Sequence, residues 1–277
     1  RERGGTAPLV HYVAPQVWAW RPERTAKTAA LFDRLLCLFP FEPDWFTPHG
    51  LDAVHVGHPA VERFDGGDAA GFRARRGIDP DAPLLAVLPG SRKGEVGRML
   101  PIFGRTVKRL ARQMPDLQVV VPTVETVAGR VEREVAGWPL PVQVIPAAER
   151  YDALPAATAA LATSGTITLE LALAGVPFVT AYRANPITAW IVRRALSVTY
   201  ATMANVLLDR EAVPEFLQEA CRADRLAPAL AGLLRDGEGA AAQRGAFAEV
   251  RHMLADTPLP PSEQAAWAVL ETIGRRG

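Results

Sequence analysis

Short apolar runs alternate with longer amphipathic stretches from Leu84 onward, and this alternation restricts the possible folds more than any other feature of the chain. Alternation of this kind is typical of strands in a parallel sheet that is covered by helices. The predicted strands span 84–88, 117–121, 142–145, 159–162 and 178–181, and helical patterns fall near 95–113, 125–135, 151–154 and 166–174. The sequence therefore predicts an α/β unit of Rossmann-like type with right-handed crossovers.

A shorter segment of similar character precedes this unit. It contains predicted strands at 10–13, 35–39 and 53–56, with a helix at 23–32. We expect residues 1–62 to form the C-terminal part of an N-terminal Rossmann-like domain, and 63–83, rich in Gly, Asp, Arg and Pro, to form a linker. Residues 84–260 are then the second domain, and a final helix within 261–277 is expected to pack back on the first domain.

The beginning of the chain leads to a further expectation. It starts at Arg1 without a methionine, and the first methionine is Met99. We therefore expect the N-terminal domain to be incomplete, with part of its chemistry in a segment that precedes Arg1.

Composition and charge narrow the classes of function. Hydrophobic residues make up 49% of the 277 residues, which excludes an intrinsically disordered chain. The 31 basic and 30 acidic residues leave a net charge of +1, so no strong overall field favours a nucleic-acid partner. Cys37 and Cys221 belong to no metal-binding pattern, so we expect no metal, no cofactor and a reducing cytoplasm. No apolar run approaches the roughly 20 residues that span a bilayer.

The first candidate site is the loop Gly90-Ser91-Arg92, which follows a predicted strand and precedes a predicted helix. Open α/β sheets bind ligands at this position. Gly90 permits a close backbone approach, the helix N-terminus favours an anion, and Arg92 can bind phosphate oxygens through two hydrogen bonds. The pattern is neither GxxxxGK[ST] nor GxGxxG, so nucleotide triphosphate hydrolysis and nicotinamide binding lose support. An ordinary turn with a solvated arginine is equally consistent with this loop alone.

A second loop, Ser164-Gly165-Thr166, also follows a strand and opens a helix. Its small residues leave room for a phosphate, and Ser164 or Thr166 can cap the helix. Glu170 lies one helical turn after Thr166, within reach of a sugar diol. The simpler interpretation of Glu170 is a glutamate that complements the helix dipole. Two loops of this type on one sheet favour a phosphate-binding site.

Several blocks of sequence resemble the lipid-A-disaccharide synthase family in content and order, nearly from end to end. The blocks are YVAPQVWAWR at 12–21, FPFE at 39–42, VGHP at 56–59, LPGSR at 88–92 with Glu95, SGTITLE at 164–170, AYR at 181–183 and NVLL at 205–208.

This resemblance implies a GT-B glycosyltransferase fold, with two Rossmann-like domains and a cleft between them. It implies an inverting, metal-independent transfer from UDP-2,3-diacylglucosamine to 2,3-diacylglucosamine 1-phosphate, with release of UDP, in lipid A biosynthesis. Two alternatives remain open at this stage: a UDP-N-acetylglucosamine 2-epimerase, which shares the fold and a similar UDP site, and a UDP-sugar-binding fragment without catalysis.

The resemblance also implies roles for single residues. The residues expected at the UDP donor are Gly90, Ser91, Arg92, Ser164, Gly165, Thr166, Glu170 and Asn205. Arg92 would stabilise the departing diphosphate, Glu170 would bind the ribose hydroxyls, and Asn205 would lie near the nucleotide. The general base of the family is expected upstream of Arg1, so the chain alone should be a poor catalyst.

Further expectations concern the acceptor and the surroundings of the protein. Gln16, Trp18, Trp20 and His58 are expected to line the acceptor side of the cleft. The basic pattern at 187–196 fits a helix on an anionic membrane surface, although a packed helix is equally consistent with it. Acylated substrates imply peripheral association with the cytoplasmic face of the bacterial inner membrane. An apolar face on the last helix predicts a homodimer.

Overall fold

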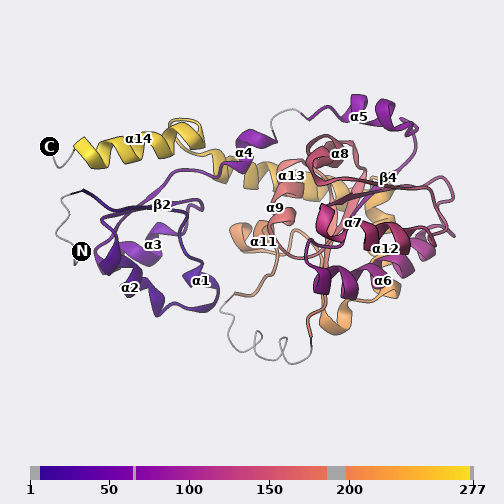
Figure 1. Cartoon of the computed structure of the whole chain (residues 1–277), viewed down its shortest axis with the longest axis horizontal. Helices are drawn as coiled ribbons and strands as arrows, with labels where there is room; N and C mark the ends of the chain where they lie inside the picture. The colour runs from indigo at the N-terminus through magenta and orange to yellow at the C-terminus, as the bar shows by residue number, and fades with distance from the viewer. Residues whose placement is uncertain (1–6, 65–66, 186–197, 275–277) are drawn as a thin grey trace. The chain divides into compact units, whose positions relative to one another are not determined.

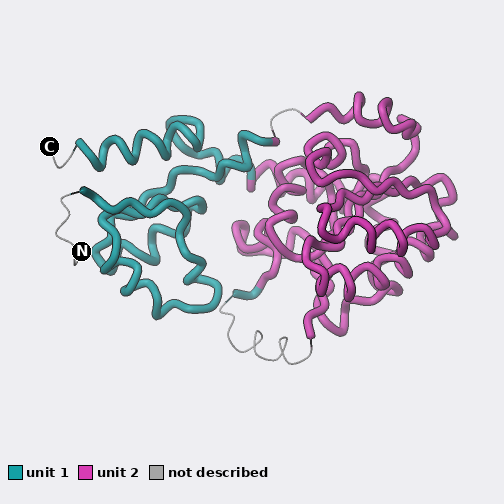
Figure 2. The backbone as a smooth tube through the Cα atoms, viewed as in Figure 1, with its two compact units in different colours: residues 1–63, 191–199, 251–277 teal, residues 64–190, 200–250 magenta. Residues whose placement is uncertain are grey.

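Two parallel sheets organise the chain, each in its own unit (Figures 1 and 2). The structure, a computed structural model, describes residues 7–64, 67–185 and 198–274. Unit 1 comprises 1–63, 191–199 and 251–277, and unit 2 comprises 64–190 and 200–250. The predicted α/β class is confirmed. Of the segment predicted as a linker, 63–83, residues 64–83 group with unit 2, whereas 251–260 of the predicted second domain group with unit 1.

Unit 1 contains a three-stranded parallel sheet in the order β1-β2-β3. Its strands are β1 (Val10–Tyr12), β2 (Arg34–Cys37) and β3 (Asp52–His55), and its helices are α1 (Val17–Trp20), α2 (Arg24–Leu31), α3 (Pro43–Phe46), α4 (Ala60–Arg63) and α14 (Pro261–Gly274). Side chains alternate along β2, because successive residues of a strand point to opposite faces. Leu35 and Cys37 pack with Phe46 on one face, and Leu36 packs with Ala268 of α14 on the other.

A buried arginine attaches α14 to the sheet of unit 1. The Arg34 side chain is only 5% exposed, and its Nη1 donates to the carbonyl of Ala268 (3.1 Å), to Oε2 of Glu271 (2.7 Å) and to Oγ1 of Thr272 (3.1 Å). A buried charge is tolerated only when it is paired and hydrogen-bonded in this way. The last helix therefore packs on β2 through specific polar contacts as well as apolar ones.

Unit 2 contains a six-stranded parallel sheet in the order β6-β5-β4-β7-β8-β9. The strands are β4 (Leu84–Leu88), β5 (Gln118–Thr123), β6 (Val142–Pro146), β7 (Ala159–Ala162), β8 (Phe178–Tyr182) and β9 (Glu215–Leu217). The helices are α5 (Ala69–Arg76), α6 (Lys93–Leu110), α7 (Glu125–Val135), α8 (Arg150–Ala156), α9 (Thr166–Leu173), α11 (Met203–Leu208), α12 (Ala223–Leu234) and α13 (Glu238–Ala255), the last of which continues into unit 1 from Arg251.

Helices cover both faces of this sheet. Leu85 and Val87 of β4 belong to the apolar core that includes buried residues of α6, α7 and α12. On the other face, the ring of Phe178 of β8 stacks on that of Phe247 of α13, with 5.5 Å between the ring centres. The backbone N–H of Phe178 donates to the buried side chain of Gln243, and its carbonyl accepts from the same side chain. Strands β5, β4, β7 and β8 are almost wholly buried, as expected for the centre of a parallel sheet that is covered on both faces.

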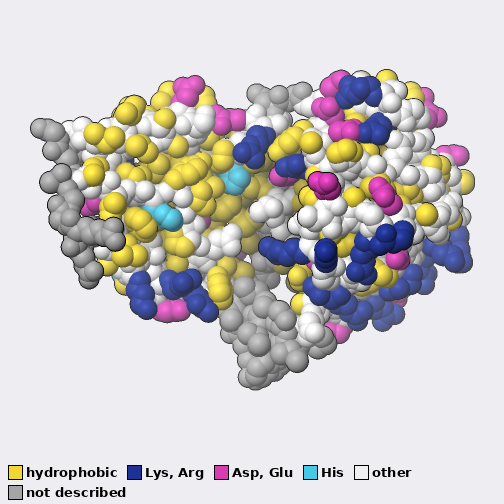
Figure 3. All heavy atoms as spheres, viewed as in Figure 1, with side chains coloured by type: hydrophobic (Ala, Val, Ile, Leu, Met, Phe, Trp, Pro, Cys, Tyr) yellow, Lys and Arg dark blue, Asp and Glu magenta, His cyan; other side chains and the backbone are white. Residues whose placement is uncertain are grey.

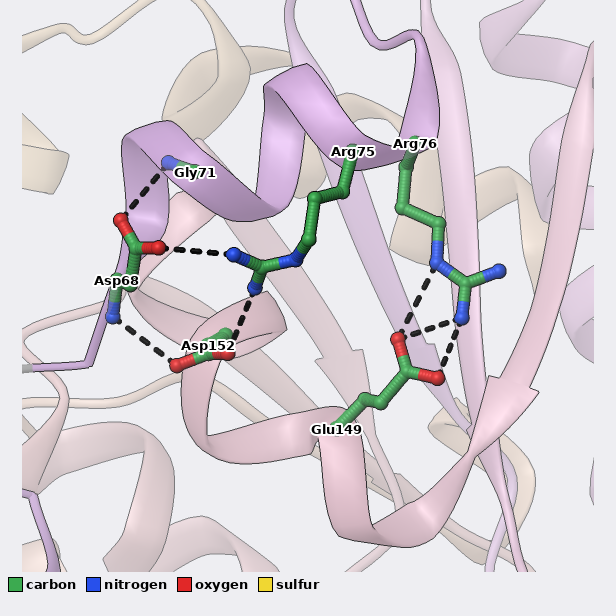
Figure 4. A network of polar contacts seen from close by, with 6 residues as sticks. All are labelled: Asp68, Gly71, Arg75, Arg76, Glu149 and Asp152. Atoms are coloured by element: carbon green, nitrogen blue, oxygen red, sulfur yellow. Dashed lines mark hydrogen bonds and ion pairs between the residues drawn. The ribbon is translucent and has the colours of Figure 1, made fainter.

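A polar network fixes α5 to α8 (Figure 4). Arg75 bonds to Asp68 and to Asp152, both at 2.9 Å, and Arg76 forms an ion pair with Glu149. Glu149 and Asp152 flank the first residue of α8, so the network holds that helix start in place from the side of α5.

The described part of the chain contains no helix that is long and apolar enough to cross a membrane. The basic helix predicted at 187–196 lies outside the described residues.

Candidate functional site

A cavity of about 480 Å³ lies at the carboxyl ends of β4, β5 and β7 in unit 2. Seven of the eight residues expected at the donor line it: Gly90, Ser91, Arg92, Ser164, Gly165, Thr166 and Glu170. The two loops singled out from the sequence therefore face one space, although they are more than 70 residues apart in the chain. Glu95 and Arg150, which were not predicted as site residues, also line the cavity.

The loop after β4 requires glycine at position 90. Gly90 has φ +102°, and a Cβ there would overlap the Glu95 carboxylate. That carboxylate accepts a hydrogen bond from the backbone N–H of Ser91 at 3.2 Å, which holds the loop against the first turn of α6. The side chain of Arg92 is exposed and makes no ion pair with any residue that the structure describes. Its guanidinium is therefore available to an anion in the cavity.

The loop after β7 is tied to the loop after β4. The backbone N–H and the hydroxyl of Thr163 both donate to the carbonyl of Leu88, at 3.0 and 3.3 Å. The Ser164 hydroxyl donates to the carbonyl of Ala201 at 2.8 Å, so it does not cap α9 as predicted. No side chain caps this helix, whose first residue is Thr166. Its first backbone N–H groups and its positive dipole end thus face the cavity.

Glu170 is held by Arg150, the first residue of α8. Nε of Arg150 donates to Oε2 of Glu170 at 2.7 Å, and Nη2 donates to Oε1 at 3.3 Å. The hydrogen bond that Arg150 donates to Glu170 raises the pKa of Arg150. The guanidinium also lies 4.3 Å above the centre of the Tyr151 ring. A signal for Arg150 existed in the sequence, because it opens a helix after a strand, at the sheet edge where the two loops lie.

Asn205 lies outside the lining of this cavity. It is fully buried, and its Nδ2 donates to the carbonyl of Val213 (2.8 Å) and to Oε1 of Glu215 (2.9 Å). Its Oδ1 accepts from the backbone N–H groups of Ala212 and Val213. Because an amide has two donor hydrogens and two acceptor positions, the group is saturated. The structure thus gives Asn205 the role of fixing the chain between α11 and β9.

The four residues expected on the acceptor side lie in unit 1 in different environments. Trp18 is 6% exposed, donates from Nε1 to Glu42 at 3.2 Å and packs edge-on against Phe41, so it is a core residue of its unit. Trp20 is 45% exposed, and Gln16 is exposed. His58 is half-buried and accepts from the backbone N–H of Ala60, and burial lowers its pKa to about 4.

Within the described ranges no group of three or more His, Cys, Asp or Glu side chains is arranged to hold a metal ion. The positive groups that face the cavity of about 480 Å³ are Arg92, Arg150 and the start of α9.

Solved structures define the class of fold. HepE from Anabaena, in complex with UDP and glucose, matches with a TM-score of 0.52 and 12% identity over 97% of this chain and 72% of that one. UDP-GlcNAc 2-epimerase from Neisseria meningitidis matches with a TM-score of 0.55 and 12% identity over 83% and 63%. A glycosyltransferase from Rickettsia africae matches with a TM-score of 0.51 and 9% identity over 91% and 67%. The chain thus has the GT-B fold.

Sequence comparison distinguishes among proteins of this class. The family model for lipid-A-disaccharide synthetase matches residues 1–267. The lipid-A-disaccharide synthase of Rhodospirillum centenum is 50% identical over 100% of this chain and 69% of its own length. That of Paramagnetospirillum magneticum is 46% identical over 99% of this chain and 71% of its own. The chain belongs to the lipid-A-disaccharide synthase family, a family of glycosyltransferases, and the resemblance found in the sequence is confirmed.

Proposed function

We propose that unit 2 binds the donor UDP-2,3-diacylglucosamine in the cavity at the carboxyl ends of β4 and β7. The sugar passes with inversion, and without a metal ion, to 2,3-diacylglucosamine 1-phosphate, and UDP is released. The observation that carries this proposal is the convergence of Gly90–Arg92, Ser164–Thr166 and Glu170 on one cavity of about 480 Å³.

In this proposal the diphosphate of UDP lies between the two loops. The uncapped start of α9 offers backbone N–H groups to phosphate oxygens, and Gly90 leaves space for a close approach. Arg92 makes no ion pair with any residue in the described part of the chain, so its guanidinium can pair with the charge that develops on the departing diphosphate. Fixed positive groups of this kind stabilise the negative charge of the leaving diphosphate, as a metal ion does in other transferases.

The ribose of UDP is recognised by Glu170. Both of its oxygens already accept from Arg150, and each keeps a further lone pair for a ribose hydroxyl. A carboxylate held on two sides loses little rotational freedom when the nucleotide binds. Arg150 thus belongs to the donor site as a positioning residue.

In this proposal the acceptor binds to residues of unit 1. Trp20 offers an apolar surface, and Gln16 and His58 offer polar contacts. The acceptor hydroxyl must lose its proton during transfer. His58, with a pKa of about 4, is a weak base at neutral pH, so we assign it binding and not proton abstraction.

Two further parts of the proposal concern assembly and location. Trp267, Leu270 and Ile273 are exposed on α14, at 51, 67 and 55%, which supports a homodimer formed through that helix. The acylated substrates support peripheral association with the cytoplasmic face of the inner membrane. Sedimentation analysis of the chain and of its Leu270→Glu variant tests the homodimer. The expected result is a concentration-dependent dimer that the substitution dissociates. A chain that is strictly monomeric would contradict the proposal.

The test of the proposed reaction is incubation of the chain with both lipid substrates in the presence of EDTA. Slow formation of a tetraacyl disaccharide phosphate, with one equivalent of UDP, is the expected result, because the chain alone is expected to be a poor catalyst. Conversion of a UDP-sugar to its manno epimer without an acceptor would instead support a 2-epimerase. UDP binding without either product would support a binding fragment.

A further inference from the structure

A second concave site lies in unit 2 and is lined by basic side chains. It is a cavity of about 460 Å³ that shares no lining residue with the donor cavity. Its cations are Arg105, Lys108, Arg109, Arg112, Arg183 and Arg222, called here the basic cluster. Figure 3 shows basic side chains gathered over the region that α6 and α12 occupy in Figure 1.

Three separate elements supply this cluster. Arg105, Lys108 and Arg109 belong to α6, and Arg112 follows its last turn, at the spacing i, i+3, i+4 and i+7 that places side chains on one helix face. The opposite face of α6 carries buried Met99, Phe103 and Val107. Arg183 follows β8, and Arg222 is the residue before α12. The cluster is therefore assembled by the tertiary fold and not by one charged helix alone.

The charges of the cluster are poorly compensated. Its lining contains one carboxylate among the described residues, Asp224, which is bound by Arg222 through two hydrogen bonds of 2.8 and 3.1 Å. The other five cations make no ion pair with any described residue. Like charges three or four positions apart destabilise a helix, so this face of α6 has an electrostatic cost that a bound anion would remove.

The geometry points to a ligand that carries a phosphate group. Planar guanidinium groups match phosphate oxygens in pairs, and five of the six cations are arginines. A concave site suits a compact anion better than an extended one. Every exposed large hydrophobic side chain of the described residues lies in unit 1, so contact with a lipid here would be confined to its headgroup.

We infer that the basic cluster is a second phosphate-binding site, occupied either by a phospholipid headgroup or by a soluble phosphate compound. This inference does not depend on glycosyl transfer. It gives the chain a means to hold a phosphorylated partner apart from the donor nucleotide.

The test uses the whole chain and two triple variants with the same loss of charge. The cluster variant is Arg105→Gln/Arg109→Gln/Arg112→Gln. The control variant is Arg130→Gln/Arg133→Gln/Arg235→Gln, whose residues are exposed in unit 2 and do not line the cavity. Circular dichroism and UDP titration of each variant show whether the fold and the donor cavity are intact.

Two probes distinguish the sources of phosphate. Pyrophosphate is titrated calorimetrically in the presence of saturating UDP, which occupies the donor cavity, and co-sedimentation is measured with phosphatidylcholine vesicles with and without phosphatidylglycerol. If headgroups are bound, the chain sediments only with the anionic vesicles, and the cluster variant binds them about a hundredfold more weakly. If a soluble compound is bound, pyrophosphate binding weakens about tenfold in the cluster variant. The control variant retains binding in either case. Equal behaviour of the two variants toward both probes would overturn the inference.

Discussion

Arg150 and Glu170 form a two-point ion pair at the edge of the donor cavity, with Nε to Oε2 at 2.7 Å and Nη2 to Oε1 at 3.3 Å. The arginine opens α8 and the glutamate lies on α9, 20 residues later. The polar network that attaches α8 to α5 fixes one side of this pair, because Glu149 and Asp152 flank Arg150. The position of the carboxylate thus depends on residues well outside the two loops.

Arg150→Gln should weaken UDP binding about tenfold, because one charge-assisted contact to Glu170 is lost and the carboxylate is no longer oriented. The substitution should also reduce the preference for UDP over 2′-deoxy-UDP, because Arg150 orients the Glu170 carboxylate that is proposed to bind the ribose hydroxyls. Calorimetric titration of both nucleotides measures this, with Arg133→Gln as the control. An unchanged preference would show that Arg150 is merely structural.

Gly90→Ala should abolish UDP binding, whereas Gly77→Ala should not. Both glycines have positive φ, +102° and +62°, so each substitution should cost about 1–2 kcal/mol of stability. A Cβ at Gly77 meets nothing within 4 Å, but one at Gly90 overlaps the Glu95 carboxylate that holds Ser91. Thermal unfolding and UDP titration separate the two effects. Retained binding in Gly90→Ala would contradict the proposed loop geometry.

Arg34→Met should release α14 from β2. The substitution removes a buried cation together with its three hydrogen bonds, including the ion pair to Glu271, at a cost of about 3–5 kcal/mol. Hydrogen exchange should become much faster along α14. Arg24→Met, at an exposed position of the same unit, should leave exchange unchanged. Persistent protection of α14 in Arg34→Met would show that apolar contacts alone hold the helix.

His58 should make the stability of the chain depend on pH between about 4 and 6.5. Burial lowers the pKa of the folded state, so the unfolded state binds more protons as pH falls through this range, and stability decreases by at most about 3 kcal/mol. Below pH 4 the effect levels off. Burial also lowers the pKa of His55, and it raises that of Glu42, which acts in the opposite sense.

The comparison with His58→Gln isolates the contribution of this residue. Chemical unfolding at several pH values should give two stability curves that converge below pH 6.5 as the wild type loses its advantage. Parallel curves would contradict the lowered pKa.

The sequence was most informative where burial alone decides the structure. β4 has the predicted bounds, because five consecutive apolar residues between turn signals require a strand buried on both faces. Helix α7 also has the predicted bounds, because its buried Val127, Val131 and Val135 repeat at helical spacing. Strand β9 was missed, since it has three residues and includes Glu215, whose carboxylate binds the backbone of Ala201 and Thr202.

The contacts of Trp18 and Asn205 could not be predicted from the sequence, and the physical reason is the same for both. The role of Trp18 depends on its hydrogen bond to Glu42, and that of Asn205 depends on Glu215 and the backbone at Val213. Such partners are brought together only by the tertiary fold, so no local pattern marks them. The two loops that line the cavity of about 480 Å³, in contrast, each combine a strand end, a glycine and a helix start within a few residues, and local sequence is sufficient to find them.

The most direct test of the donor site is calorimetric titration of UDP into the chain without metal, with Arg92→Ala and Glu170→Ala measured beside it. The account predicts saturable binding of UDP, weakened at least about tenfold by each substitution, since each removes a contact that involves a charged group. Binding that neither substitution changes, or no binding to the folded chain, would contradict the assignment of this cavity to the UDP-sugar donor.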